Sequence, residues 1–277
     1  MKKYLELVKF SHTIFSLPFI LIAMIVGANG WFGWKLFILA LLSAISARNF
    51  AMAFNRLVDR DIDAKNPRTK DRISVRGDIS VDEMRLFIVA NALIFIGTAY
   101  MINDLAFKLS FLILIILAGY SYFKRFSAFA HLVLGVSLGF APIAGAIAVT
   151  GSIPCWSVFL AFGTMFWVAG FDILYSLQDM EFDKKEGLFS IPAIVGERGA
   201  LFMAKMFHVF AVIFWALFVA YANLGFFAWI GVLISGAILY YEHLLISKSF
   251  DNIPKAFFDL NGFLGIIFLV FIILDRL

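Results

Sequence analysis

The amino-acid sequence predicts an all-α integral membrane protein, and its composition is the first reason. Hydrophobic residues make up 62% of the 277 residues and charged residues 15%, whereas a soluble domain has roughly half and about a quarter. The mean hydropathy is +0.93. With only 23 Lys and Arg and 19 Asp and Glu, the chain cannot cover itself with polar surface, so lipid must replace water on most faces.

The same composition excludes several classes of protein. A disordered chain, a nucleic-acid-binding protein and a disulfide scaffold do not fit it, and we expect no nucleic-acid partner. The single cysteine, Cys155, excludes an internal disulfide and a cysteine-based metal cluster. The net charge of +4 and the pI near 9.1 instead suit the basic cytoplasmic loops of a membrane protein.

The second reason is the length of the apolar runs, which approach the roughly 20 residues needed to cross a ~30 Å hydrocarbon core. They comprise residues 12–30, 35–57, 83–103, 107–123, 129–150, 155–177, 200–222, 225–246 and 256–275. We therefore expect nine transmembrane helices, forming a single domain over residues 1–277.

The third reason is the distribution of charge. If the N-terminus lies inside, the basic residues left outside are only Lys35, Lys108 and Arg276. We therefore place the protein in the cytoplasmic (inner) membrane, with two long loops, about 58–82 and 178–199, in the cytosol. These loops are longer than a connection needs to be and rich in charge, so we expect the active site at these two cytosolic cap loops.

Each cap loop begins with a stripe of oxygen-bearing side chains. Asn55, Asp59 and Asp63 follow one another at intervals of four residues, so a continuous helix would place them on one face. The sixth apolar run ends in an equivalent stripe, made of Asp172, Asp179 and Asp183. Like charges four residues apart repel by a few tenths of a kcal/mol. Repetition of this arrangement indicates a cation between the carboxylates.

Solvated carboxylates are the simpler interpretation for the remaining acidic residues of the loops, namely Asp61, Asp71, Asp78, Asp82 and Glu186. That interpretation fails for Asp172, which lies inside an apolar run, where a carboxylate costs several kcal/mol unless it faces a polar cavity. Arg48 lies inside the second run, two turns before Asn55 and on the same stripe. A structural salt bridge is the alternative interpretation for Arg48.

The two motifs superimpose at an offset of 120 residues, with Asp59 on Asp179, Asp63 on Asp183 and Asn55 on Tyr175. This match indicates two pseudo-repeats and would bring the stripes face to face. Hard oxygen donors at this spacing favour Mg²⁺, which binds through carboxylates and substrate phosphates. Basic residues surround them: Arg68, Arg72, Lys124, Arg125, Lys184 and Lys185. Acidic stripes for a metal, with cations for phosphoryl oxygens, describe a diphosphate site, and the apolar helices imply a lipid-like tail. Positive-inside topology alone is the alternative explanation of the cations.

These residues resemble the UbiA family of membrane-embedded prenyltransferases, whose signatures are N-x-x-x-D-x-x-x-D and D-x-x-Y-x-x-x-D-x-x-x-D. Both signatures are present in full, as Asn55/Asp59/Asp63 and Asp172/Tyr175/Asp179/Asp183. The resemblance extends to residues 10–18, 53–56, 66–69, 122–125, 170–172 and 190–192. Within the family, these segments are similar to the quinone-pathway branch, that is, to 4-hydroxybenzoate polyprenyltransferases or their menaquinone-pathway relatives. One departure is the segment 73–77, where the family usually has a proline-containing sequence, and we expect it to alter loop stiffness.

The resemblance implies nine transmembrane helices around a central cavity, closed by the cap loops and open sideways to membrane lipid. It implies Mg²⁺-dependent transfer of a polyprenyl group from polyprenyl diphosphate to an aromatic carboxylic acid, such as 4-hydroxybenzoate in respiratory quinone biosynthesis. The implied metal ligands are Asn55, Asp63, Asp179 and Asp183, and the implied diphosphate ligands are Asn55, Arg68, Arg72 and Lys124. Asp59 would orient or deprotonate the acceptor, and Arg48 would bind the acceptor carboxylate. Asp172 and Tyr175, implied with Asp59 as catalytic residues, would support the second metal site and the diphosphate.

Other acceptors stay open within the family: a naphthoate for menaquinone, a porphyrin or a phosphosugar. An ion-coupled transporter, with Asp172 and Arg48 on an ion path, is the alternative from another class. The charges argue against transport, because nearly all of them lie at the cytosolic rim rather than at mid-membrane.

Overall fold

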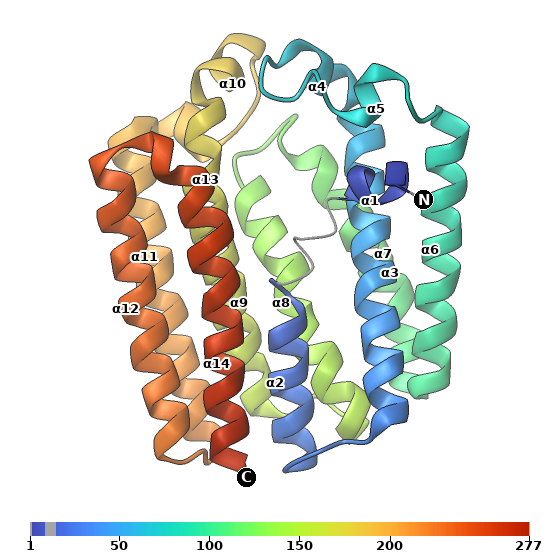
Figure 1. The fold of residues 1–277 in the computed structure, drawn as a ribbon, viewed down its shortest axis with the longest axis vertical. Helices are drawn as coiled ribbons and strands as arrows, with labels where there is room; N and C mark the ends of the chain where they lie inside the picture. The colour runs from blue at the N-terminus through green and yellow to red at the C-terminus, as the bar shows by residue number, and fades with distance from the viewer. Residues whose placement is uncertain (1, 9–14, 277) are drawn as a thin grey trace.

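Long helices form a bundle that short helices cap at one end (Figure 1). The coordinates are a computed structural model that describes residues 2–8 and 15–276. Every regular element within these residues is helical. The predicted all-α fold class is therefore confirmed.

The long helices run between the two ends of the bundle. They are α2 (Leu17–Ala28), α3 (Trp34–Val58), α6 (Val81–Ile102), α7 (Asp104–Phe123), α8 (Ala130–Thr150), α9 (Cys155–Ser176), α11 (Ile191–Tyr221), α12 (Phe226–Lys248) and α14 (Asn261–Arg276). The short helices are α1 (Lys2–Val8), α4 (Arg60–Lys65), α5 (Ile73–Arg76), α10 (Met180–Glu186) and α13 (Ile253–Lys255). A π-helical turn, Ala256–Leu260, leads into α14.

Eight of the described helices are long and apolar enough to cross a membrane. Helix α2 is apolar but has 12 residues. The predicted first span, 12–30, and the family-like segment 10–18 begin in residues 9–14, which lie outside the described residues. The structure thus agrees with an integral membrane protein, and the count of nine spans stays a prediction.

From the second span onward the predicted spans match the helices to within about three residues, except at α11 and at α14, which begins at Asn261 after a π-helical turn. The apolar pattern predicts a start near residue 200, but α11 begins at Ile191, where the Ser190 hydroxyl accepts a hydrogen bond from the backbone N–H of Ala193. Glu197 and Arg198 interrupt the apolar pattern there. The helix also bends at Gly196, whose φ of 73° lies in the left-handed region that glycine tolerates best.

The aromatic core holds the second half of the bundle together. Phe19 of α2 lies 5.0 Å from Trp167 of α9, and Trp215 of α11 lies 5.6 Å from Phe268 of α14, measured between ring centroids. Gly163 lets the Trp215 ring reach the backbone of α9, because any side chain at that position would collide with the ring. Helix α9, which carries Asp172, is therefore held rigidly between its neighbours.

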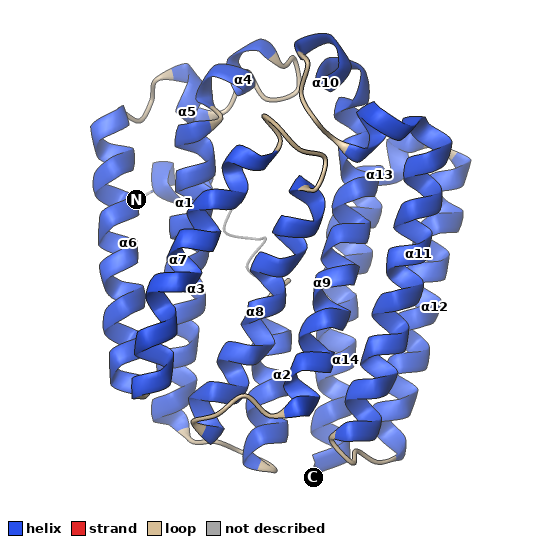
Figure 2. Ribbon diagram, turned by 180° about the vertical axis from the view of Figure 1, so that it is seen from behind, coloured by secondary structure: helices blue, strands red, loops and turns tan. Residues whose placement is uncertain are grey.

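Both stripes cross a helix boundary, so the predicted continuous helices are interrupted. Helix α3 ends at Val58 and α4 begins at Arg60, yet Asp63 still donates its backbone N–H to the Asp59 carbonyl at 2.8 Å. A 3₁₀ turn, Leu177–Asp179, separates α9 from α10 in the same way. The interruptions bend the chain over the end of the bundle, and α4 and α10 lie side by side there (Figures 1 and 2).

Candidate active site

A cavity of about 590 Å³ opens beneath the two caps. Its wall includes every site residue predicted from the sequence: Arg48, Asn55, Asp59, Asp63, Arg68, Arg72, Lys124, Asp172, Tyr175, Asp179 and Asp183. Towards the opposite end of the bundle the wall becomes apolar, with side chains such as Phe95, Ile102, Leu109 and Ile147. The cavity thus combines a charged mouth with an apolar interior.

Asp59 lies at the junction of α3 and α4 and is almost fully buried. Its Oδ2 accepts a hydrogen bond from Asn55 Nδ2 at 2.9 Å and pairs with Lys124 Nζ at 2.7 Å. Its Oδ1 is buried and has no hydrogen-bond partner within the described chain. Burial raises the pKa of Asp59, while Lys124 acts to lower it. Arg125 Nη2 lies 3.7 Å from Oδ1, so this oxygen has a cation nearby but accepts no hydrogen bond.

Lys124 and Arg125 reach different partners, although α7 ends at Phe123 and the helical rotation expected between them does not apply. Lys124 lines the cavity. Arg125 instead donates to Asp61 at 2.9 Å and to the Val58 carbonyl at 2.6 Å, on a shallow hollow outside the cavity. The pairing of Arg125 holds the pKa of Asp61 below its usual value.

Asp63 is buried one turn beyond Asp59. Both of its carboxylate oxygens accept hydrogen bonds from Arg72 Nη1, at 2.6 and 2.7 Å. A second guanidinium, that of Arg56, approaches Asp63 Oδ2 to 3.7 Å. This part of the wall therefore sets one carboxylate against two arginines.

Asp179 joins the second stripe to the first cap loop. Arg68 donates to it through Nε at 2.8 Å and also through Nη2, and Asn66 Nδ2 donates at 2.9 Å. The same guanidinium donates from Nη1 to the Tyr175 hydroxyl at 3.1 Å. Two charge-assisted hydrogen bonds in a fork give the pair a defined geometry.

A further ion pair links the caps at their exposed rim, where Lys65 of α4 contacts Glu186 of α10 at 2.8 Å. The second cap also meets α7, because the Phe189 backbone N–H donates to the Lys124 carbonyl at 2.8 Å. The first cap, the second cap and the end of α7 thus close one end of the cavity together. The predicted juxtaposition of the two cap loops agrees with this geometry.

Asp172 is held by a histidine that the motifs do not contain. His131, buried at the start of α8, lies 2.7 Å from Asp172 Oδ2 through Nδ1. The Ile191 backbone N–H donates to His131 Nε2 at 3.3 Å, so Nε2 carries no proton. The ring is therefore the neutral tautomer with its proton on Nδ1, and it donates that proton to Asp172. His131 fixes the direction of the Asp172 carboxylate and ties it to the second cap.

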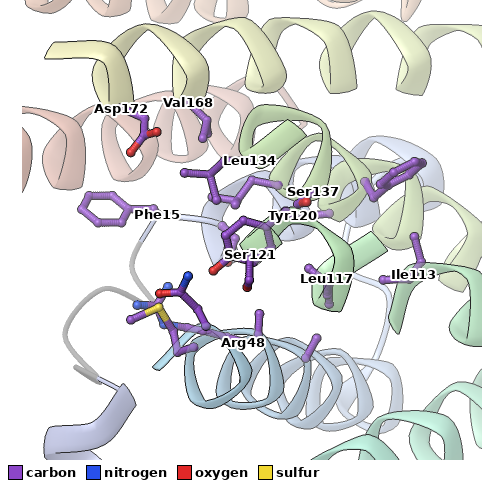
Figure 3. A pocket seen from close by; sticks show the side chains of 18 of the residues that line it. Phe15, Arg48, Ile113, Leu117, Tyr120, Ser121, Leu134, Ser137, Val168 and Asp172 are labelled. Atoms are coloured by element: carbon purple, nitrogen blue, oxygen red, sulfur yellow. The ribbon is translucent and has the colours of Figure 1, made fainter. Parts of the chain in front are cut away.

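Arg48 lies deeper on α3. Figure 3 shows Arg48 and Asp172 on opposite sides of the cavity, with Tyr120 and Ser121 of α7 between them. Arg48 lines the cavity, and its contact with an acceptor carboxylate stays a prediction.

The donor set suits Mg²⁺ chemically, although it is not pre-assembled. Carboxylate and amide oxygens of Asn55, Asp63, Asp179 and Asp183 line one cavity, and these are ligand types that Mg²⁺ takes. Within the described residues, no three acidic, histidine or cysteine side chains converge closely enough to hold a metal ion. Arg72 and Arg68 donate to Asp63 and Asp179 in this arrangement.

Comparison with known proteins decides the family. The UbiA prenyltransferase family matches residues 16–272. The chain belongs to the UbiA prenyltransferase family. A similar protein from Herminiimonas arsenicoxydans, named 4-hydroxybenzoate octaprenyltransferase, is 30% identical over 92% of this chain and 89% of its own length. A protein of the same name from Shewanella woodyi is 27% identical, over 93% and 91%.

Solved structures of UbiA homologues share the fold. The apo structure of a UbiA homologue from Aeropyrum pernix K1 has a TM-score of 0.87 and 32% identity, covering 96% of this chain and 98% of that one. A UbiA homologue from Archaeoglobus fulgidus bound to DMAPP and Mg²⁺ has a TM-score of 0.77 and 23% identity, covering 98% and 99%. The family resemblance expected from the two motifs is therefore confirmed.

Two cavity residues, Arg56 and His131, were missed by motif reasoning. Each is an ionisable residue next to or within an apolar run, which is the signal that singled out Arg48 and Asp172. A search for every ionisable residue next to or within an apolar run would therefore have identified Arg56 and His131.

Proposed function

We propose that this protein is a Mg²⁺-dependent prenyltransferase that moves a polyprenyl group from polyprenyl diphosphate to an aromatic carboxylic acid such as 4-hydroxybenzoate. The observation that supports it most is the cavity itself, in which two carboxylate stripes and three phosphate-type cations meet above an apolar interior. The names of the similar proteins support the acceptor class. The homologue structures with DMAPP or GPP and Mg²⁺ support the donor class and the metal.

The charged mouth would bind the diphosphate. Asn55, Asp63, Asp179 and Asp183 would hold Mg²⁺, which supplies positive charge to the departing diphosphate oxygen. Arg68, Arg72 and Lys124, now paired with carboxylates, would transfer their N–H donors to phosphoryl oxygens. That exchange would release the carboxylates for the metal, so substrate and metal each favour binding of the other.

The acceptor would lie between the mouth and Arg48. Its carboxylate would pair with the Arg48 guanidinium, and its phenol O–H would donate to Oδ1 of Asp59, which accepts no hydrogen bond within the described chain. When the allylic C–O bond breaks, its electron pair stays on the diphosphate, and the ring's π electrons form the new C–C bond to the allylic carbon. The hydrogen on the substituted ring carbon then leaves as a proton. Asp172, fixed by His131, and Tyr175 would orient the second cap around the diphosphate.

The apolar wall would serve two purposes. It would take up the isoprenoid chain, which buries apolar surface from lipid or water. It would also keep water from the allylic cation, which water would otherwise capture. The positive-inside distribution of charge supports an orientation in the cytoplasmic membrane with both caps in the cytosol.

The test is a transfer assay in membranes that contain the full-length protein, with Mg²⁺ and radiolabelled polyprenyl diphosphate. 4-Hydroxybenzoate and a dihydroxynaphthoate are offered separately. We expect label in the prenylated benzoate and none after EDTA treatment. Transfer to the naphthoate alone would overturn the acceptor, and no transfer to either would overturn the proposed function.

A further inference from the structure

Arg56 is a buried arginine on the cavity wall to which neither the motifs nor the proposed function give a role. It is only 5% exposed and lines the cavity. Its Nη1 is buried and has no hydrogen-bond partner within the described chain. A buried N–H that lacks a partner is destabilising, and more so when the group is charged. Such a donor points to a ligand.

The carboxylate nearest to Arg56 does not satisfy it. Asp63 Oδ2 lies 3.7 Å from Arg56 Nη1, beyond hydrogen-bonding distance. Both oxygens of Asp63 already accept hydrogen bonds from Arg72. One carboxylate therefore faces two guanidinium groups, and this part of the wall carries a surplus positive charge that an anion would neutralise.

The position of Arg56 selects which anion. Arg56 shares its carboxylate neighbour with Arg72, at the charged mouth beneath the first cap. Arg48, which the proposed function assigns to the acceptor carboxylate, lies two turns deeper in α3. The diphosphate is therefore the anion within reach of Arg56, whereas the acceptor carboxylate belongs at the other side of the cavity.

We propose that Arg56 is a further diphosphate-binding residue, whose Nη1 donates a hydrogen bond to a phosphoryl oxygen of the prenyl diphosphate. This inference rests on the proposed function. If Arg72 donated to the diphosphate and Asp63 held Mg²⁺, Arg56 would still place a positive charge beside Asp63. A guanidinium suits this position because it stays protonated when buried and offers directional donors to phosphate oxygens.

The test compares binding of inorganic pyrophosphate, with Mg²⁺, by the purified full-length protein and its variants. Isothermal titration gives the affinity, and the increase in Tm on adding Mg²⁺ and pyrophosphate gives an independent measure. The variants are Arg56→Met, Arg56→Lys and a matched control, Arg60→Met, which removes the same charge one turn away. Arg60 borders the shallow hollow outside the cavity.

We expect Arg56→Met to weaken pyrophosphate binding about tenfold or more, because a charge-assisted hydrogen bond is lost. Arg56→Lys keeps the charge, so its pyrophosphate affinity should lie between those of the wild type and Arg56→Met. Arg60→Met should bind pyrophosphate like the wild type. The KM for prenyl diphosphate should rise with the loss of affinity, while the KM for the aromatic acceptor should not.

A lowered Tm in Arg56→Met with unchanged pyrophosphate affinity would overturn the inference, because Arg56 would then only balance Asp63. If Arg56→Met does not fold, Arg56→Lys decides, and a wild-type KM for prenyl diphosphate in that variant would overturn it. Failure of the wild type to bind pyrophosphate would overturn the proposed function itself. The two failures are distinguishable because the second is seen without any variant.

Discussion

His131 offers a sharp test of the site, because its two ring nitrogens do different things. Nδ1 donates to Asp172 at 2.7 Å and Nε2 accepts from the Ile191 backbone at 3.3 Å. An asparagine at this position can place its amide nitrogen where the histidine has Nδ1. A glutamine can place its amide oxygen where the histidine has Nε2. His131→Asn should therefore keep the contact with Asp172 and lose the one with Ile191, and His131→Gln should do the reverse.

The size of the effects follows from the partners. The Asp172 contact involves a carboxylate, and hydrogen bonds of this kind contribute about 1.5–3 kcal/mol. If that energy keeps Asp172 in its working position, its loss in His131→Gln or His131→Ala lowers kcat roughly 10- to 100-fold. The contact with the Ile191 N–H is neutral and longer, so His131→Asn should lose at most about tenfold.

The assay is steady-state transfer at saturating Mg²⁺, with Tm measured for each variant. We expect kcat to rank as wild type, Asn, Gln and Ala, while KM for the acceptor changes little. His131 would then be a positioning residue that acts through Asp172. Equal losses in His131→Asn and His131→Gln, in parallel with Tm, would refute this role and leave only a packing function.

Two further predictions concern the basic residues. Lys124→Ala should raise the KM for prenyl diphosphate. It should also move the acidic limb of the kcat profile to higher pH, since burial raises the pKa of Asp59 and Lys124 opposes that rise. Arg125→Ala should change this KM less, and an unmoved limb or the reverse ranking would contradict the assignment. Arg48→Lys keeps the charge but loses the fork, so the KM of a carboxylated acceptor should rise well before that of prenyl diphosphate, and equal losses with a decarboxylated acceptor would exclude acceptor binding.

The sequence predicted most of the fold because lipid-facing helices must be apolar along their whole length. That constraint placed α3, α7, α8 and α9 within a few residues of their observed ends. It could not place the start of α11, where a serine cap and a glycine bend at residue 196 let a polar segment join an apolar helix. Such a start depends on local hydrogen bonding, which hydropathy does not register.

The site was predictable as far as spacing determines it. Intervals of four residues put Asn55, Asp59 and Asp63 on one face, and the repeat placed Asp179 opposite. Which cation meets which carboxylate was not predictable. The pairs Arg72–Asp63 and Arg68–Asp179 depend on how the loop 66–72 folds back across the caps, and the pair His131–Asp172 joins residues 41 positions apart.

The central claim is that the two stripes form a single Mg²⁺–diphosphate site, and turnover of Asp63→Asn and Asp183→Asn tests it most directly. Each substitution keeps the side-chain shape and removes one negative ligand from a different stripe. We predict that either variant inserts into the membrane yet loses turnover by at least about a hundredfold, as EDTA should cause in the wild type. Asp61→Asn, which alters an exposed carboxylate paired with Arg125, should remain active. Normal turnover in either stripe variant, or in the wild type in metal-free buffer, would contradict the shared site.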